Sequence, residues 1–301
     1  MLKTGYVKSD EEYKYIDDYF NKHISKFDET KFGFREKYCH LLENENPNMI
    51  FLNPVFFLKG NHYLLESFFM LKYKSKFKKY LDLLEETIHD SRFPVNDNIA
   101  SLSFLYLYNN KLNYHILEGT FDESEYLIPE ILEKIKIHNE HLDEHHEMMF
   151  YYKIACIYFG TEKYAESIYY LEKIINNKNL IMREDLMCFA RLLYLIVHYE
   201  MGKDFNLETQ LKSTYKFLLK MNDLHEVQKE IIRFLKNLNS FYPSDIKKEF
   251  IKMRERFIEL EKNTYEKRAF LYLDIISWLE SKIENRKIAD IMKEKAKLIN
   301  R

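Results

Sequence analysis

The segment Phe121–Tyr126 reads FDESEY, and the segment Tyr164–Tyr169, which lies 43 residues further along the chain, reads YAESIY. Each follows a Gly-Thr pair, Gly119-Thr120 or Gly160-Thr161, at the end of an aromatic-rich stretch. Repeats of about 20 to 50 residues that contain two helices are typical of helical solenoids, in which stacked units share one core because no unit can bury its own apolar face. The two segments therefore predict an array of helix pairs.

The composition favours helices joined by short turns. Of the 301 residues, 46% are hydrophobic and 16% are aromatic, which is sufficient for a continuous core. The chain has only six Gly and five Pro, whereas average usage is about 7% Gly and about 5% Pro. No sustained alternation of β-branched residues between Asn-Gly or Asp-Gly turns indicates a sheet. We predict an all-α protein.

Hydrophobic spacing divides the chain into an N-terminal helical segment, a repeat array and a C-terminal helical hairpin, over residues 1–61, 62–240 and 241–301. The N-terminal segment contains one or two helices over 10–45 and an irregular joint over 44–61, where Pro47, Pro54 and Gly60 lie. The helices expected after this joint are 62–72, 76–90, 97–118, 123–138, 145–160, 163–177, 184–201, 207–221, 223–240, 243–262, 264–284 and 286–299.

One unit of the array, Met148–Ile181, has the most complete pattern. Its aromatic, bulky and small residues recur at helical spacing, at Tyr151, Ile154, Ala155 and Tyr158 in the first helix and at Tyr164, Ser167, Leu171 and Ile174 in the second. This pattern resembles the tetratricopeptide repeat, in which small residues let two antiparallel helices approach. Ile174 replaces a small residue of that family, Asn179 stands where Pro is common, and the spacing of 43 residues exceeds the usual value of about 34. The resemblance, which is to bacterial proteins of this kind, implies a right-handed α-α superhelix.

The resemblance also implies a concave binding face. Aligning Phe121 with Tyr164 places polar and aromatic residues of two successive units on that face, namely Tyr106, Asn109, Asn113, Met149, Tyr152, Cys156 and Phe159. Asn is a poor helix former, and its amide can pair with the backbone of an extended peptide. We therefore expect these residues to bind a protein or peptide. Alternatively, the two Asn are simply exposed to solvent, or they cap an internal break in a long helix.

A histidine-rich segment supplies a competing interpretation. Residues His138–Glu147 read HNEHLDEHHE, and His141–His145 within them match the H-x-x-E-H pattern of inverted zinc peptidases, where two imidazoles hold zinc and a Glu activates water. A zinc-dependent hydrolase built on the His138–His146 cluster is thus a remote alternative. The repeat register, however, places a turn here that would separate His141 from His145, and no third ligand is identifiable. We expect a polar connection that holds no metal.

The charge pattern does not indicate nucleic acid or a membrane as a partner. The net charge is −2, so no global field attracts phosphate groups. Residues Lys72–Tyr80 (KYKSKFKKY) interleave basic and aromatic residues, but on a helix Tyr73, Phe77 and Tyr80 share one face, so we expect them in the core with the lysines in water. The sequence has neither an apolar leader pattern after Met1 nor a run of about 18 uncharged apolar residues.

The cysteines and glycines argue against a redox or nucleotide site. Cys39, Cys156 and Cys188 have no C-x-x-C spacing, and a sparse, odd set is typical of reduced thiols in a cytosolic protein. A nucleophile made from Cys156 or Cys188 with His198 lacks any positioning motif. Since the chain has neither a P-loop nor G-x-G-x-x-G, we expect no cofactor.

These features together predict a cytoplasmic, non-catalytic scaffold that binds a protein or a peptide. The main alternative is a peptide-sensing regulator, because some bacterial regulators that the chain resembles join such an array to an N-terminal helix-turn-helix. Residues 1–60 lack a compact three-helix pattern with a basic recognition helix, so we favour the scaffold and expect neither nucleic acid nor a membrane as its partner.

Overall fold

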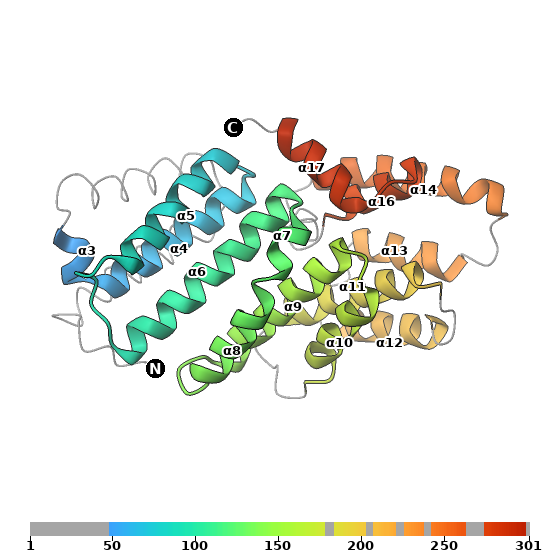
Figure 1. The fold of residues 1–301 in the computed structure, drawn as a ribbon. Coiled ribbons are helices and arrows are strands. Elements are labelled where there is room, and N and C mark those ends of the chain that lie inside the picture. The colour runs from blue at the N-terminus through green and yellow to red at the C-terminus, as the bar shows by residue number, and fades with distance from the viewer. Residues whose placement is uncertain are drawn as a thin grey trace. The chain divides into compact units, whose positions relative to one another are not determined.

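The computed structural model describes residues 48–177, 184–202, 207–220, 226–237, 242–262 and 274–298. Within these ranges every regular element is a helix, which confirms the predicted all-α class for this part of the chain (Figure 1). The helices predicted over residues 10–45 lie outside the described residues.

The helices follow one another with short connections. Their bounds are α3 Asn48–Leu52, α4 Pro54–Met70, α5 Lys74–His89, α6 Asp97–Glu118, α7 Phe121–Glu125, α8 Ile128–Ile137, α9 Glu144–Gly160, α10 Tyr164–Ile175, α11 Glu184–Glu200, α12 Leu207–Lys220, α13 Glu226–Asn237, α14 Pro243–Glu261, α16 Ile275–Glu284 and α17 Ile288–Leu298. Most predicted helices agree closely with these bounds. The helix predicted over 123–138 is instead two helices, α7 and α8, and Pro129 lies in the first turn of α8 where its missing N–H costs nothing.

The predicted irregular joint over 44–61 is wrong for the residues from Asn48 onward, which form α3 and the first half of α4. Pro54 is the first residue of α4 and therefore begins this helix rather than interrupting it. The side chain of Asn53 caps the helix, because its Oδ1 accepts a hydrogen bond of 3.3 Å from the backbone N–H of Phe56. Gly60 lies inside α4.

The described residues form two compact units, which divide within α6 after Asn110. In the first unit α4 packs against α5, and the ring of Phe68 stacks on that of Tyr80 with centroids 5.5 Å apart. In the second unit α9 packs on α10, α10 on α11 and α11 on α12, while α14 packs on α16. The boundaries predicted at residues 61 and 240 stay predictions.

The crossing of α9 and α10 confirms one prediction in detail. Ala155 and Ser167 are both fully buried, and the Ser167 hydroxyl donates a hydrogen bond of 2.9 Å to the backbone carbonyl of Ala155. A larger side chain at either position would push the helices apart. The two small residues therefore set the close approach that the sequence pattern indicated.

The same turn closes several helices. Left-handed residues follow α4, α6, α9, α11 and α16, at Lys72, Gly119, Glu162, Gly202 and Asn285. After α6 the N–H of Thr120 donates to the carbonyl of His115 at 3.0 Å, and after α9 the N–H of Lys163 donates to the carbonyl of Tyr158 at 2.8 Å, as in a Schellman motif. The conformational counterpart of Gly119 is thus Glu162, which is also 43 residues away, and the two Gly-Thr pairs serve different purposes.

Candidate functional site

The residues predicted to line a concave groove are mostly buried. On α6, Tyr106 and Asn109 belong to the first unit and Asn113 belongs to the second, and the two Asn are only 1% and 4% exposed. The predicted residues of α9 lie in the second unit, where Tyr152, Cys156 and Phe159 are buried and Met149 is half-buried. The alternative that the two Asn are simply exposed to solvent is therefore wrong. A binding role for these seven residues stays a prediction.

Helix packing within the first unit accounts for part of this burial. The Tyr106 ring stacks on His62 of α4 with centroids 4.4 Å apart and planes at 15°, and burial raises the pKa of the Tyr106 hydroxyl. The Asn110 side-chain amide donates to the Tyr106 carbonyl at 2.7 Å and lies 3.1 Å from Nδ1 of His62. Because that amide group donates, Nδ1 of a neutral His62 has to accept, and its proton sits on Nε2, 3.6 Å from the Glu66 carboxylate.

The histidine-rich segment forms a connection between two helices. The helix α8 ends at Ile137 and α9 begins at Glu144, so His141 lies in the turn and His145 lies in the first turn of α9. The Asp143 side chain caps α9 by accepting from the His146 N–H at 2.9 Å. The predicted turn is confirmed, and the H-x-x-E-H residues do not share one helix. Within the described ranges no group of three or more His, Cys, Asp and Glu side chains is placed to hold a metal ion.

Two other predicted patterns also have structural explanations. Phe77 and Tyr80 of α5 are buried while Lys78 and Lys79 are exposed, which confirms the prediction for these residues. Tyr73 precedes α5 and is half-buried, so its predicted place in the core is corrected. Cys156 is buried, and burial raises the pKa of its thiol to about 12, so it is not ionised at neutral pH and is a poor nucleophile.

The feature that the sequence analysis missed is a cluster of tyrosines, the tyrosine seam, formed by Tyr151 and Tyr158 of α9 and Tyr169 and Tyr170 of α10. The Tyr170 ring is the centre of the seam. Its centroid lies 5.6 Å from that of Tyr151 and 5.8 Å from that of Tyr158, on which it stacks. The Tyr169 ring meets it edge-on at 5.1 Å and 85°. Lys173 adds a cation, with its Nζ 5.3 Å from the Tyr151 centroid and 4.9 Å from the Tyr169 centroid.

The exposure of the seam differs sharply from ring to ring. Tyr169 is 56% exposed, whereas Tyr151 and Tyr170 are largely buried beneath it. Burial, together with a hydrogen bond to Glu147, raises the pKa of the Tyr151 hydroxyl. For Tyr158, burial is the main cause of a raised pKa, and the charges of Glu125 and Glu166 act in the same direction. The phenols of Tyr151 and Tyr158 are therefore neutral at physiological pH, and carboxylates lie beside them.

This arrangement places aromatic, cationic and acidic groups side by side on α9 and α10. It offers one exposed aromatic face, a fixed ammonium group and neighbouring carboxylates, a combination that suits contact with an extended segment bearing cationic and apolar side chains. The repeat pattern predicts Tyr151 and Tyr158 only as core residues of the helix pair. The sequence did contain a signal for the seam. Tyr151 and Tyr158 are seven residues apart and therefore share one helix face, and Tyr169 and Tyr170 are adjacent in the next helix.

The comparisons with known proteins identify no relative. No protein-family model matches the chain, and the searches of curated proteins and of solved structures found no match. Among the described residues, none of the helices combines the length and the apolar character that crossing a membrane requires.

Proposed function

We propose that the chain is a tetratricopeptide-like array that binds a protein segment without catalysis, and that the tyrosine seam is its binding surface. The 43-residue repeat, the close crossing at Ala155 and Ser167, and the recurrent left-handed turns support a superhelical array of helix pairs. The seam replaces the α6 residues in this proposal, because Asn109 and Asn113 are buried whereas Tyr169 is open to a partner.

The observation that carries the proposal is the exposed Tyr169 ring. It is held between the edge of Tyr170 and the ammonium group of Lys173, so it loses little conformational freedom when a partner packs on it. Rigid aromatic side chains of this kind are common at the centres of protein interfaces. Since Glu147 and Glu166 lie beside the seam, we expect a partner segment that carries Arg or Lys.

The proposal favours binding over the zinc-hydrolase alternative because His141 does not lie on α9 with His145. The regulator alternative depends on residues 1–60, of which 1–47 lie outside the described residues. It shares the expectation of a peptide ligand and differs in its DNA target, which a mobility-shift assay over a salt series would detect.

The test compares two exposed tyrosines of the second compact unit, Tyr169 and Tyr126. A partner is captured from the native host with the intact chain, identified and titrated against Tyr169→Ala and against Tyr126→Ala, a 70% exposed residue that lies outside the seam. Loss of an interface hot spot costs at least about 2 kcal/mol, so we expect Tyr169→Ala to weaken binding by about 30-fold at an unchanged melting temperature. Equal affinities of both variants and the parent chain would place the binding surface elsewhere.

A further inference from the structure

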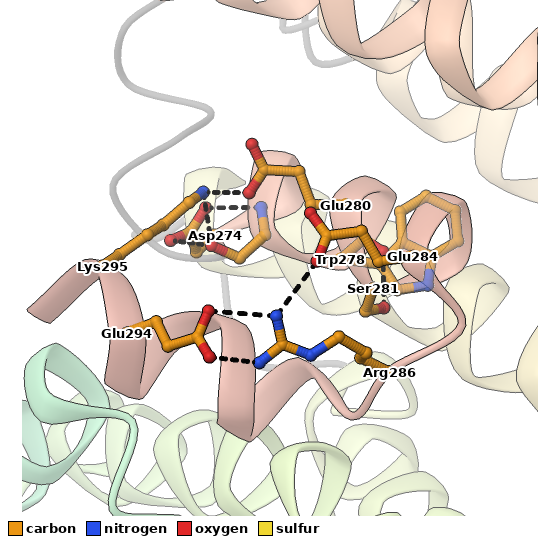
Figure 2. Close-up of polar contacts among 9 residues, drawn as sticks. Asp274, Trp278, Glu280, Ser281, Glu284, Arg286, Glu294 and Lys295 are labelled. Carbon is orange, nitrogen blue, oxygen red and sulfur yellow. Dashed lines mark hydrogen bonds and ion pairs between the residues drawn. The ribbon is translucent and has the colours of Figure 1, made fainter.

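The helices α16 and α17 form a hairpin. They are joined at Asn285, which is left-handed, and Figure 2 shows the polar contacts between them. Arg286 donates to both oxygens of Glu294, at 2.5 and 3.0 Å, and to Glu284 at 3.1 Å. Lys295 on α17 reaches Glu280 at 2.5 Å and the Ser277 hydroxyl at 2.8 Å, both on α16. Ion pairs and a hydrogen bond therefore link the two helices of the hairpin directly.

The first helix of this hairpin is fixed to the end of α11. Glu200, the last residue of α11, has a side chain that is only 7% exposed, and it accepts hydrogen bonds from Trp278 Nε1 at 2.6 Å and from Lys282 Nζ at 2.5 Å. The Trp278 ring also meets Tyr199 edge-on, with centroids 6.1 Å apart. Each oxygen of this buried carboxylate accepts from a different donor, so removing Trp278 or Lys282 would leave one oxygen without its partner on α16.

The second helix of the hairpin reaches the ends of α6 and α9. A Cβ atom on Gly119, just after α6, would lie 2.8 Å from the backbone N of Lys293 and 2.8 Å from Cβ of Met292. The α17 backbone thus touches this turn directly. Lys293 also lies 3.9 Å from Asp122 of α7, and Lys287 lies 3.5 Å from Glu162, just after α9.

These contacts share a location. The residues that the hairpin touches, Gly119, Asp122, Glu162 and Glu200, all lie at or beside the left-handed turns that end α6, α9 and α11. Lys282 pairs with Glu200 in the last turn of α11, where the helix dipole places partial negative charge. Lys287 and Lys293 pair with the carboxylates of Glu162 and Asp122, so each of the three lysines meets a carboxylate at or beside one of these turns.

We infer that α16 and α17 form an intramolecular strap that ties three successive helix pairs together and limits how far they move relative to one another. In a helical array each repeat contacts only its neighbours, so a contact between distant helices adds a restraint that neighbour packing does not supply. The strap adds contacts between residues that are far apart in the chain, namely Gly119 with Met292 and Glu200 with Trp278. These contacts are additional to the packing between neighbouring helices. It thereby converts a flexible row of helix pairs into one body.

The strap also bears on the tyrosine seam, and this step rests on the proposed function. Lys163 follows Glu162 and forms an ion pair with Glu125, and Tyr158 of the seam lies one helical turn before Glu162. A strap that holds the Glu162 turn in place also holds the α9–α10 pair that carries the seam. Releasing α17 should therefore change partner affinity without altering any seam residue.

The experiment compares two glycines in the same backbone conformation. Gly119 and Gly202 have φ angles of 69° and 61°, but a Cβ on Gly202 meets nothing within 4 Å. Ala therefore strains the turn at both positions and obstructs the strap only at Gly119. Hydrogen exchange of the full chain is measured by mass spectrometry for Gly119→Ala and Gly202→Ala. We expect amides of α17, Ile288–Leu298, to exchange at least about tenfold faster in Gly119→Ala and at the parent rate in Gly202→Ala.

A second pair of variants keeps the test decisive if Gly119→Ala does not fold. Met292→Ala removes the strap side of the same contact, and Lys297→Ala changes an exposed position of the same helix. Faster exchange of α17 in Met292→Ala alone supports the strap. Equal exchange of α17 in both members of either pair overturns it. These outcomes need no partner, so they are independent of the Tyr169→Ala titration that tests the proposed function.

Discussion

Gly160→Ala should destabilise the second unit through a single contact. Gly160 is the last residue of α9, and the Phe121 ring of α7 lies directly on it. A Cβ atom at this position would lie 2.3, 2.4 and 2.6 Å from three carbon atoms of the ring. Carbon atoms that are not bonded prefer separations of about 3.5–4.0 Å, so the ring, which is buried, has to shift by more than about 1 Å.

Two opposing effects set the magnitude of this change. Overpacking of a filled core costs about 1–3 kcal/mol, while replacing Gly by Ala in a helix stabilises it by about 0.5–1 kcal/mol. We therefore expect Gly160→Ala to lower the free energy of unfolding by about 1–2 kcal/mol. In a Phe121→Ala background the ring is gone, and the same substitution should instead raise that free energy by about 0.5–1 kcal/mol.

The reversal of sign is what the assay measures. Urea unfolding of the parent chain, both single variants and the double variant is followed by the fluorescence of Trp278, the sole tryptophan, and by far-ultraviolet circular dichroism. The resulting double-mutant cycle should show a coupling energy of about 2 kcal/mol. A Gly160→Ala variant at least as stable as the parent chain, or one equally destabilised in both backgrounds, would refute this account of the repeat junction.

Three further predictions follow from burial. Ala155→Leu should lower stability by about 1–3 kcal/mol, since it forces α9 from α10; an unchanged denaturation midpoint would contradict the crossing. The double variant Asn109→Ala, Asn113→Ala should lower the melting temperature, because both amides are buried, and an unchanged value would show them to be accessible. Burial raises the pKa of Cys156 from 9.0 to about 12, so its contribution to stability is complete below pH 9 and is lost between pH 9 and 12; a midpoint-against-pH series on the parent and Cys156→Ala checks this.

Local sequence patterns were sufficient to predict most helices and one helix crossing. Apolar residues at three- and four-residue spacing follow directly from which side of a helix is buried, so the bounds of α6 and α9 to α14 were accessible. The crossing at Ala155 and Ser167 was predicted because both partners lie within one unit of the repeat. The turn between α8 and α9 was accessible for the same reason, since the repeat register places it.

Prolines were harder to interpret, because their effect depends on their position in a helix. Pro54 and Pro129 both lie in the first turn of a helix, where a missing N–H is harmless. The sequence pattern nevertheless predicts Pro54 in an irregular joint and Pro129 inside a longer helix. Identifying the cap at Asn53 would have corrected the first interpretation.

The candidate site depended on information that a single helix does not contain. Asn109 and Asn113 were placed on a shared face from the register alone, and whether that face is open depends on what packs on it. The tyrosine seam needs the pairing of α9 with α10 to bring Tyr170 onto Tyr151 and Tyr158. The contact of Glu200 with Trp278 spans 78 residues, and no local pattern marks it.

Two constraints act on Gly119, its left-handed backbone conformation and its contact with α17, and only the first could be inferred from the sequence. As a left-handed residue after a helix, it is expected to be Gly, and the sequence suggested no other reason for it. Yet Lys72, Glu162 and Asn285 occupy the same conformation with side chains, so the turn by itself tolerates a Cβ at a cost of about 1 kcal/mol. What Gly119 cannot accommodate is a Cβ pointing into the α17 backbone. The absence of a side chain at this turn is therefore better explained by the strap than by the turn.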